Sequence, residues 1–237
     1  MKQCWKGFLP IYLLVAILVL SISAAGSKTV TALAENIPLE RSVIYVIDPG
    51  HGGVDGGAIS CTGAKESQIN LQISLRLRDI LHLLGFETVI TRDLDRDLHT
   101  SGDTIASRKL SDLKERVRIV KSTRNAVLIS IHQNMFSDGK YYGAQMFYNK
   151  NPDAMELAEL LQNAFVDTLN IGSRRKCKPV EGIYIMEQID CPGILAECGF
   201  LSNPHEEAKL RSEEYQKKIV CVIGSVLSSF AIKKANT

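Results

Sequence analysis

The sequence has almost no net charge, no internal repeat and no low-complexity tract. Its formal charge of +2 comes from the two lysines at positions 2 and 6, and the other basic residues are spread along the chain. A nucleic-acid-binding protein needs a concentrated basic surface, so we expect no nucleic-acid partner. The short basic cluster at 174–176 is interpreted as a solvated loop. With 45% hydrophobic and 23% charged residues, the composition favours neither a disordered chain nor a polytopic membrane protein.

Several catalytic signatures are also absent. The chain has no Gly-x-Ser-x-Gly elbow, which argues against a serine hydrolase of the α/β type. The glycines at 50, 52 and 53 form a turn that lacks the Gly-Lys-Ser/Thr of a phosphate-binding loop, and a histidine stands at position 51. Such glycines permit positive φ and leave room for a substrate beside a metal ion. A cysteine nucleophile would need a histidine partner, and none can be assigned.

Cysteine occurs in an odd number once the N-terminal stretch is set aside. Cys4 lies in that stretch, and the others are Cys61, Cys177, Cys191, Cys198 and Cys221. An odd number excludes a complete disulfide framework, although one disulfide among the loop cysteines is compatible with it. Cys198 and Cys221 fall in strand and helix patterns, where we expect small buried side chains or idle thiols.

A single long apolar run lies at the N-terminus. Two lysines precede an almost entirely apolar segment at 8–20, and small residues follow at 21–26. This order is typical of a secretory leader, so we predict export across the cytoplasmic membrane. Residues 1–26 are long enough either for a cleaved signal peptide or for an uncleaved signal-anchor, and we expect membrane contact only there.

The rest of the chain is predicted to form a polar linker at 27–41 and one α/β domain at 42–232. Short β-branched runs alternate with segments that have apolar residues at helical spacing. Strands are expected at 43–47, 86–91, 126–131, 144–148 and 193–198, and helices at 69–84, 112–122, 154–169 and 215–230. Crossover helices of this length imply a largely parallel sheet with helices on both faces. The polar stretch 93–111 is the long loop that we predict.

His51, Glu66 and His132 each stand at or just beyond a predicted strand end or helix start. In parallel sheets, binding sites gather at the carboxyl ends of the strands. Two imidazoles and one carboxylate hold zinc with a fourth position free, which is the pattern of a catalytic site. Taken singly, His132 is read as a core histidine and Glu66 as a carboxylate that stabilises a helix N-terminus. The combination favours a metal site.

Glu197 lies within an apolar strand pattern, where a charged side chain is costly unless it has a partner or a function. One interpretation pairs it with an arginine. The other places it near the metal, where it takes a proton from the attacking water and returns it to the leaving amine. His82, His99 and His205 are expected at the surface or behind the metal ligands.

Four segments in this order resemble the zinc-dependent N-acetylmuramoyl-L-alanine amidases of the type-3 amidase family. They are IDPGHGG at 47–53, KE at 65–66, SIHQN at 130–134 and ECGFLSN at 197–203. The resemblance extends from about residue 43 to residue 230, which is nearly the whole predicted domain. Four motifs in the correct order are far more specific than any one of them.

The resemblance implies that the His-Glu-His set binds one zinc ion and that Glu197 is the catalytic carboxylate. It also implies an open, mixed, largely parallel six-stranded sheet flanked by helices. The expected reaction is hydrolysis of the amide between the lactyl group of N-acetylmuramic acid and L-alanine in peptidoglycan. Arg92 and Asn134 lie next to matching motifs and are candidates for a substrate contact or for support of the metal ligands.

The small size and the leader are similar to those of germination-specific amidases of spore-forming bacteria, which act on cortex peptidoglycan. We expect neither the wall-binding repeats nor the long helical plug that many members of the family carry. Vegetative wall turnover or cell separation is the alternative role. A lone catalytic domain leads us to expect an accessory activating protein. Two other functions compete: a zinc carboxypeptidase acting within the stem peptide, and a non-catalytic peptidoglycan-binding module, which would need neither an open metal position nor a buried base.

Overall fold

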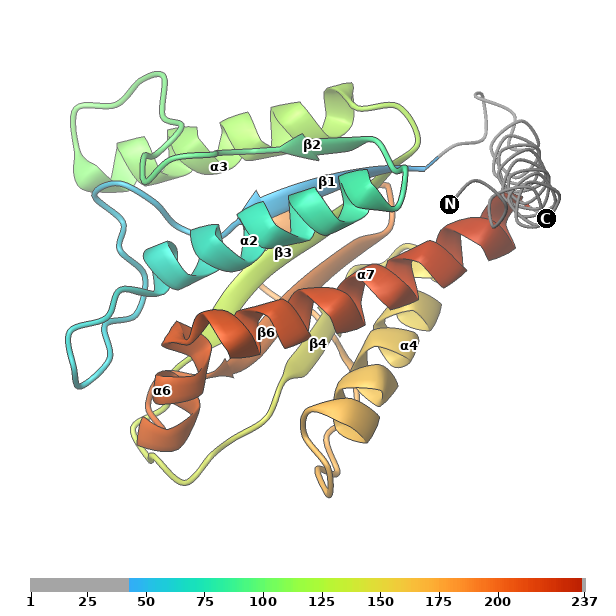
Figure 1. Cartoon of the computed structure of the whole chain (residues 1–237). Coiled ribbons are helices and arrows are strands. Elements are labelled where there is room, and N and C mark those ends of the chain that lie inside the picture. The colour runs from blue at the N-terminus through green and yellow to red at the C-terminus, as the bar shows by residue number, and fades with distance from the viewer. Residues whose placement is uncertain (1–42, 236–237) are drawn as a thin grey trace, which may run out of the picture. The chain divides into compact units, whose positions relative to one another are not determined.

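The computed structural model describes residues 43–235, which form a six-stranded sheet between two layers of helices (Figure 1). The predicted leader and linker lie outside the described residues. The elements in chain order are β1 (Ile44–Pro49), α2 (Glu66–Leu83), β2 (Thr88–Ile90), α3 (Ile105–Ser122), β3 (Ala126–Asn134), β4 (Gln145–Tyr148), α4 (Pro152–Thr168), β5 (Lys178–Pro179), α5 (Tyr184–Gln188), β6 (Gly193–Phe200), α6 (Pro204–Arg211) and α7 (Glu213–Ala235).

The sheet has the strand order β2-β1-β3-β6-β4-β5. Strands β2, β1, β3 and β6 are parallel neighbours, whereas β4 runs antiparallel to β6 and parallel to β5. The predicted mixed, largely parallel sheet is therefore confirmed. Because β1, β3 and β6 are adjacent and parallel, their carboxyl ends meet at one edge of the sheet.

The core is divided by the sheet because successive side chains of a strand point to opposite faces. Tyr45 and Ile47 of β1 pack with the helices α2, α4 and α7 on one face. Val46 of the same strand packs with α3 and α5 on the other face. Each of these side chains is fully buried, which stabilises the fold by roughly 1.5–3 kcal/mol per residue.

Helix α3 begins earlier than the sequence indicated. We expected a loop as far as residue 111, but the helix starts at Ile105, where Thr104 and Ser107 form a capping box. The first turns are solvent-exposed and carry little apolar periodicity, so the hydrophobic pattern did not reveal them. The short elements β5 and α5 were not predicted either, because two and five residues are too few to show a period.

All five cysteines of the described range are free. Cys198 is buried in β6, as predicted for a strand position. Cys221 lies in α7 with an exposed free thiol, which fits the predicted idle thiol and not the buried side chain. Within residues 43–235, no helix is both long and apolar enough to cross a membrane.

Candidate metal centre

His51 follows β1 on a loop with an unusual backbone conformation. Its φ angle is 61°, in the left-handed region that residues other than glycine rarely adopt. Gly52 and Gly53 also have positive φ, as predicted from the glycine-rich turn. Two backbone hydrogen bonds between Gly52 and Asp55 close the turn, at 2.8 and 3.1 Å. Strain of about 1–3 kcal/mol persists only where the surrounding structure imposes it.

Two buried arginines impose the left-handed backbone conformation of His51. The guanidinium of Arg92 donates to the carbonyl oxygens of five residues: Pro49, Gly50, His51, Ser67 and Leu94. Arg116 of α3 donates to two of the same carbonyls, those of Pro49 and His51. Arg92 is 1% exposed and thus supports the loop behind the site. Arg116 was missed, although a charged residue between Leu113 and Val117 on the apolar face of a helix is a signal.

Asp48 anchors this network beneath the loop. Its carboxylate accepts hydrogen bonds from Thr91 Oγ1 at 2.7 Å and Ser130 Oγ at 2.8 Å, and pairs with Arg116 at 2.6 Å. Burial opposes ionisation of Asp48, but the guanidinium and the two hydroxyl donors outweigh it and hold its pKa below the ordinary value. A charged pair is therefore built into the support of the site.

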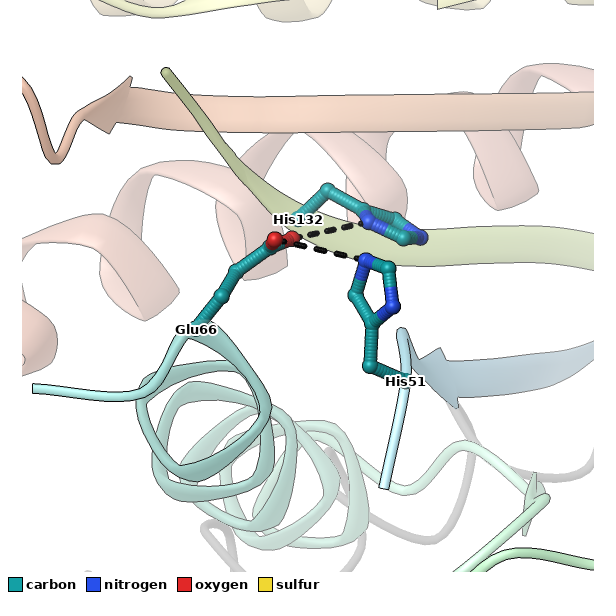
Figure 2. A group of neighbouring side chains, drawn as sticks. All are labelled: His51, Glu66 and His132. Atoms are coloured by element: carbon teal, nitrogen blue, oxygen red, sulfur yellow. Dashed lines mark hydrogen bonds and ion pairs between the residues drawn. The ribbon is translucent and has the colours of Figure 1, made fainter. Parts of the chain in front are cut away.

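Glu66, the first residue of α2, lies between the two histidines (Figure 2). Its Oε2 is 3.3 Å from Nε2 of His51, and its Oε1 is 3.0 Å from Nδ1 of His132. The three donor atoms all lie within 4.8 Å of one another. Burial opposes ionisation of Glu66, but hydrogen bonds with both imidazoles outweigh it and lower the pKa. The structure thus brings together the three residues that the sequence singled out.

Two glycines provide the space for these donors. A Cβ atom at Gly50 would lie 2.2 Å from Cε1 of His132. A Cβ atom at Gly57 would lie 2.5 Å from Oε2 of Glu66 and 2.7 Å from Cδ2 of His51. Gly57, which has a φ angle of 65°, was not identified from the sequence. Both positions exclude any side chain larger than hydrogen.

The donor set fits a zinc ion with an open position. Donors bound to one zinc ion at about 2.0–2.2 Å lie roughly 3–4 Å from one another, and the Glu66 oxygens lie 3.3 and 3.0 Å from nitrogens of His51 and His132. Within the described part of the chain, the group has three members and not the four of a structural zinc site. Three ligands with a free position are typical of catalytic zinc.

Glu197 lies in β6 in register with His132 of the neighbouring strand. Its Oε2 is buried and has no hydrogen-bond partner in the described range. The interpretation as a carboxylate paired with an arginine is therefore wrong. Burial raises the pKa of Glu197 to about 7, with opposing effects of His132 and Glu66. A carboxyl group of this pKa exchanges protons readily near neutral pH.

Asn134 ends β3, two residues beyond His132. Its backbone carbonyl accepts a hydrogen bond from the Leu201 amide at 2.8 Å, which joins β3 to the turn after β6. Its side chain is half-buried at the same sheet edge. His82 and His205 are at the surface, and His99 is half-buried beside Asp97, so none of the three joins the donor set.

Comparison with known proteins agrees with this geometry. The family model described as N-acetylmuramoyl-L-alanine amidase matches residues 45–228. The germination-specific N-acetylmuramoyl-L-alanine amidase of Bacillus subtilis (strain 168) is 38% identical over 192 residues, which cover 79% of this chain and 79% of that protein. The amidase AmiA of Escherichia coli (strain K12) is 29% identical, over 79% of this chain and 75% of that protein.

Solved structures show the same similarity. The CwlD amidase from Clostridioides difficile, determined in complex with the GerS lipoprotein, has a TM-score of 0.77 and 34% identity. The match covers 80% of this chain and 98% of that chain. An N-acetylmuramoyl-L-alanine amidase from Clostridium difficile 630 has a TM-score of 0.70 and 30% identity, over 80% of this chain and 97% of that chain.

Proposed function

This chain belongs to the N-acetylmuramoyl-L-alanine amidase family, and on that premise we propose a zinc-dependent mechanism in which Glu197 transfers the proton. The bond cut is the amide between N-acetylmuramic acid and L-alanine in peptidoglycan. One observation carries the mechanism: an unpaired, buried carboxylate oxygen stands on the strand beside His132, within electrostatic range of all three metal-binding candidates.

His51, Glu66 and His132 hold the zinc ion in this proposal. Bound there, zinc would supply a Lewis acid for the scissile carbonyl and would lower the pKa of water. Two imidazoles and one carboxylate are the ligand set of several zinc peptidases, so amide hydrolysis suits these residues. The buried, ionised Glu66 balances part of the charge of a dication.

Glu197 acts twice in each turnover. Its carboxylate takes a proton from the water that attacks the lactyl carbonyl, and a carbon–oxygen bond forms. It then returns the proton to the alanine nitrogen as the carbon–nitrogen bond breaks. The products are a lactyl carboxylate on the glycan and a stem peptide with a free amino terminus. A pKa of about 7 suits both directions of transfer at neutral pH.

The similarity to a germination-specific amidase and to CwlD supports a role in spore cortex processing. The structure of CwlD was determined in complex with a lipoprotein, so we propose that the accessory partner expected for this chain is also a lipoprotein. The leader predicted at residues 1–26 would deliver the enzyme outside the cytoplasmic membrane, either released or anchored. Mass spectrometry of cortex and vegetative wall fragments, with and without the gene, tests this role. Changes confined to the vegetative wall would contradict it.

Product analysis tests the bond that is cut. The zinc-loaded protein should expose amino-terminal L-alanine on purified peptidoglycan and leave the glycan strands continuous. Labelling of free amines, acid hydrolysis and chiral identification measure this directly. Release of D-alanine would indicate a carboxypeptidase instead, and binding without any product would indicate a peptidoglycan-binding module.

A further inference from the structure

Asp55 is the fourth residue after His51, and its position is fixed by the backbone. The two hydrogen bonds between Gly52 and Asp55 close the turn that carries both residues. The carboxylate points back at the imidazole: Oδ2 of Asp55 is 3.1 Å from Nδ1 of His51. The side chain is 35% exposed, so this contact lies at the rim of the site.

The two nitrogens of His51 therefore face different carboxylates. Nε2 is directed at Glu66, on the side of the donor set, and Nδ1 is directed at Asp55 on the other side. An aspartate oxygen accepts a hydrogen bond, so Asp55 holds a proton on Nδ1, and the lone pair of Nε2 is available to a metal ion bound between His51 and Glu66. That is the form of histidine that binds a metal ion through Nε2.

Two further groups hold the Asp55 carboxylate. Its Oδ1 accepts a hydrogen bond from the Gly57 amide at 3.3 Å. Nζ of Lys109, from α3, lies 3.0 Å from Oδ2. The carboxylate is thus held by its own loop and by a helix about fifty residues away in sequence, which limits its freedom to turn away from His51.

From these contacts we infer that Asp55 is a positioning residue of the metal centre. It fixes the tautomer and the orientation of His51, and its negative charge increases the basicity of the imidazole toward a cation. This inference rests on the proposed zinc centre but not on the substrate. Removal of such a partner lowers metal affinity by about 10–100-fold in other metal sites.

The test is zinc affinity, measured by chelator competition on the full-length protein. We expect Asp55→Ala to bind zinc about 10–100-fold more weakly. Asp55→Asn should lose less, because the amide oxygen still accepts from Nδ1 but carries no charge. Asp97→Asn is the matched control, since Asp97 lines a pocket together with His51 and Asp55 but pairs with His99. Its zinc affinity should equal that of the wild type.

Nitrogen-15 NMR of the His51 ring gives a second readout, which loss of loop packing alone would not produce. With zinc bound, the wild type should show the proton on Nδ1 with the chemical shift of a hydrogen bond to a carboxylate, and Asp55→Ala should lose that shift. Wild-type affinity in Asp55→Ala overturns the inference. If that variant does not fold, wild-type affinity and a wild-type Nδ1 chemical shift in Asp55→Asn overturn it equally, because Asn lacks the carboxylate charge. Failure of the wild type to bind zinc would overturn the metal centre itself, whereas absence of amidase products would leave the zinc titration valid.

Discussion

At the scale of single residues, the catalytic assignment rests on Glu197. Replacement by Gln keeps the shape of the side chain but removes the proton acceptor. We expect Glu197→Gln to bind zinc like the wild type and to lose about 10²–10⁴-fold in kcat, the usual contribution of general acid–base catalysis. Zinc content and turnover on purified peptidoglycan measure the two effects separately. Wild-type turnover would show that another group moves the proton.

The pH dependence of kcat/KM is a second prediction for this residue. Catalysis begins with the ionised carboxylate of Glu197. Burial raises the pKa of this group to about 7, so the ionised fraction, and with it kcat/KM, should fall as the pH drops through this range. The charge of a bound zinc ion favours the ionised form and would place the midpoint at or below that value. A rate profile with no acid limb would contradict the assignment of Glu197 as the base.

Gly57 offers a test of the space around the donors. Gly57→Ala places a methyl group against Glu66 and His51, so zinc affinity should fall at least tenfold, or about 1.4 kcal/mol. Gly63→Ala is the control: Gly63 also has positive φ, at 85°, but nothing lies within 4 Å of a Cβ there. Both variants bear the same kind of backbone strain, so a difference in zinc affinity reports the contact. Equal affinities would contradict the proposed crowding.

At the scale of elements, α3 supports the metal-binding loop through Arg116. Removal of one partner of a buried ion pair leaves an uncompensated charge, so Arg116→Ala should lower the free energy of unfolding by about 3–5 kcal/mol. Arg118→Ala, on the exposed side of the same helix, should leave the free energy of unfolding almost unchanged, because solvent screens its pair with Glu115. Urea unfolding of both variants measures this. A similar small loss in both would contradict a structural role for the pair.

The elements also show where the sequence was informative. Strand ends and the periodic helices α2, α4 and α7 were predicted because their burial produces a regular apolar pattern. Of the residues that support the site, Arg92 was a candidate from the sequence. Arg116, Asp55 and Gly57 were not, since they act through contacts distant from their own patterns. His51 was identified by its motif. Its left-handed backbone is held by a hydrogen bond from Arg92, which lies between β2 and α3, and no pattern near His51 in the sequence predicts that contact.

At the scale of the whole molecule, the donors come from a loop after β1, the start of α2 and strand β3. A zinc ion bound to all three would bind the folded chain but not the unfolded one. Zinc at one hundred times its dissociation constant should therefore add about 2.7 kcal/mol to the free energy of unfolding. Chelation should remove both this gain and the activity, and zinc should restore them. His132→Ala should show no gain; an equal gain in that variant would place zinc elsewhere.

The unpaired oxygen of Glu197 has a further consequence for how the sequence can change over generations. A buried acceptor without a partner lowers the free energy of unfolding by about 1–3 kcal/mol. This oxygen belongs to β6, which has a neighbouring strand on each side. A library of variants selected for thermal stability alone should thus replace Glu197 early, by a neutral residue of similar size. Selection for cleavage of peptidoglycan should retain it in every survivor. The same position would then be among the most variable under one selection and invariant under the other.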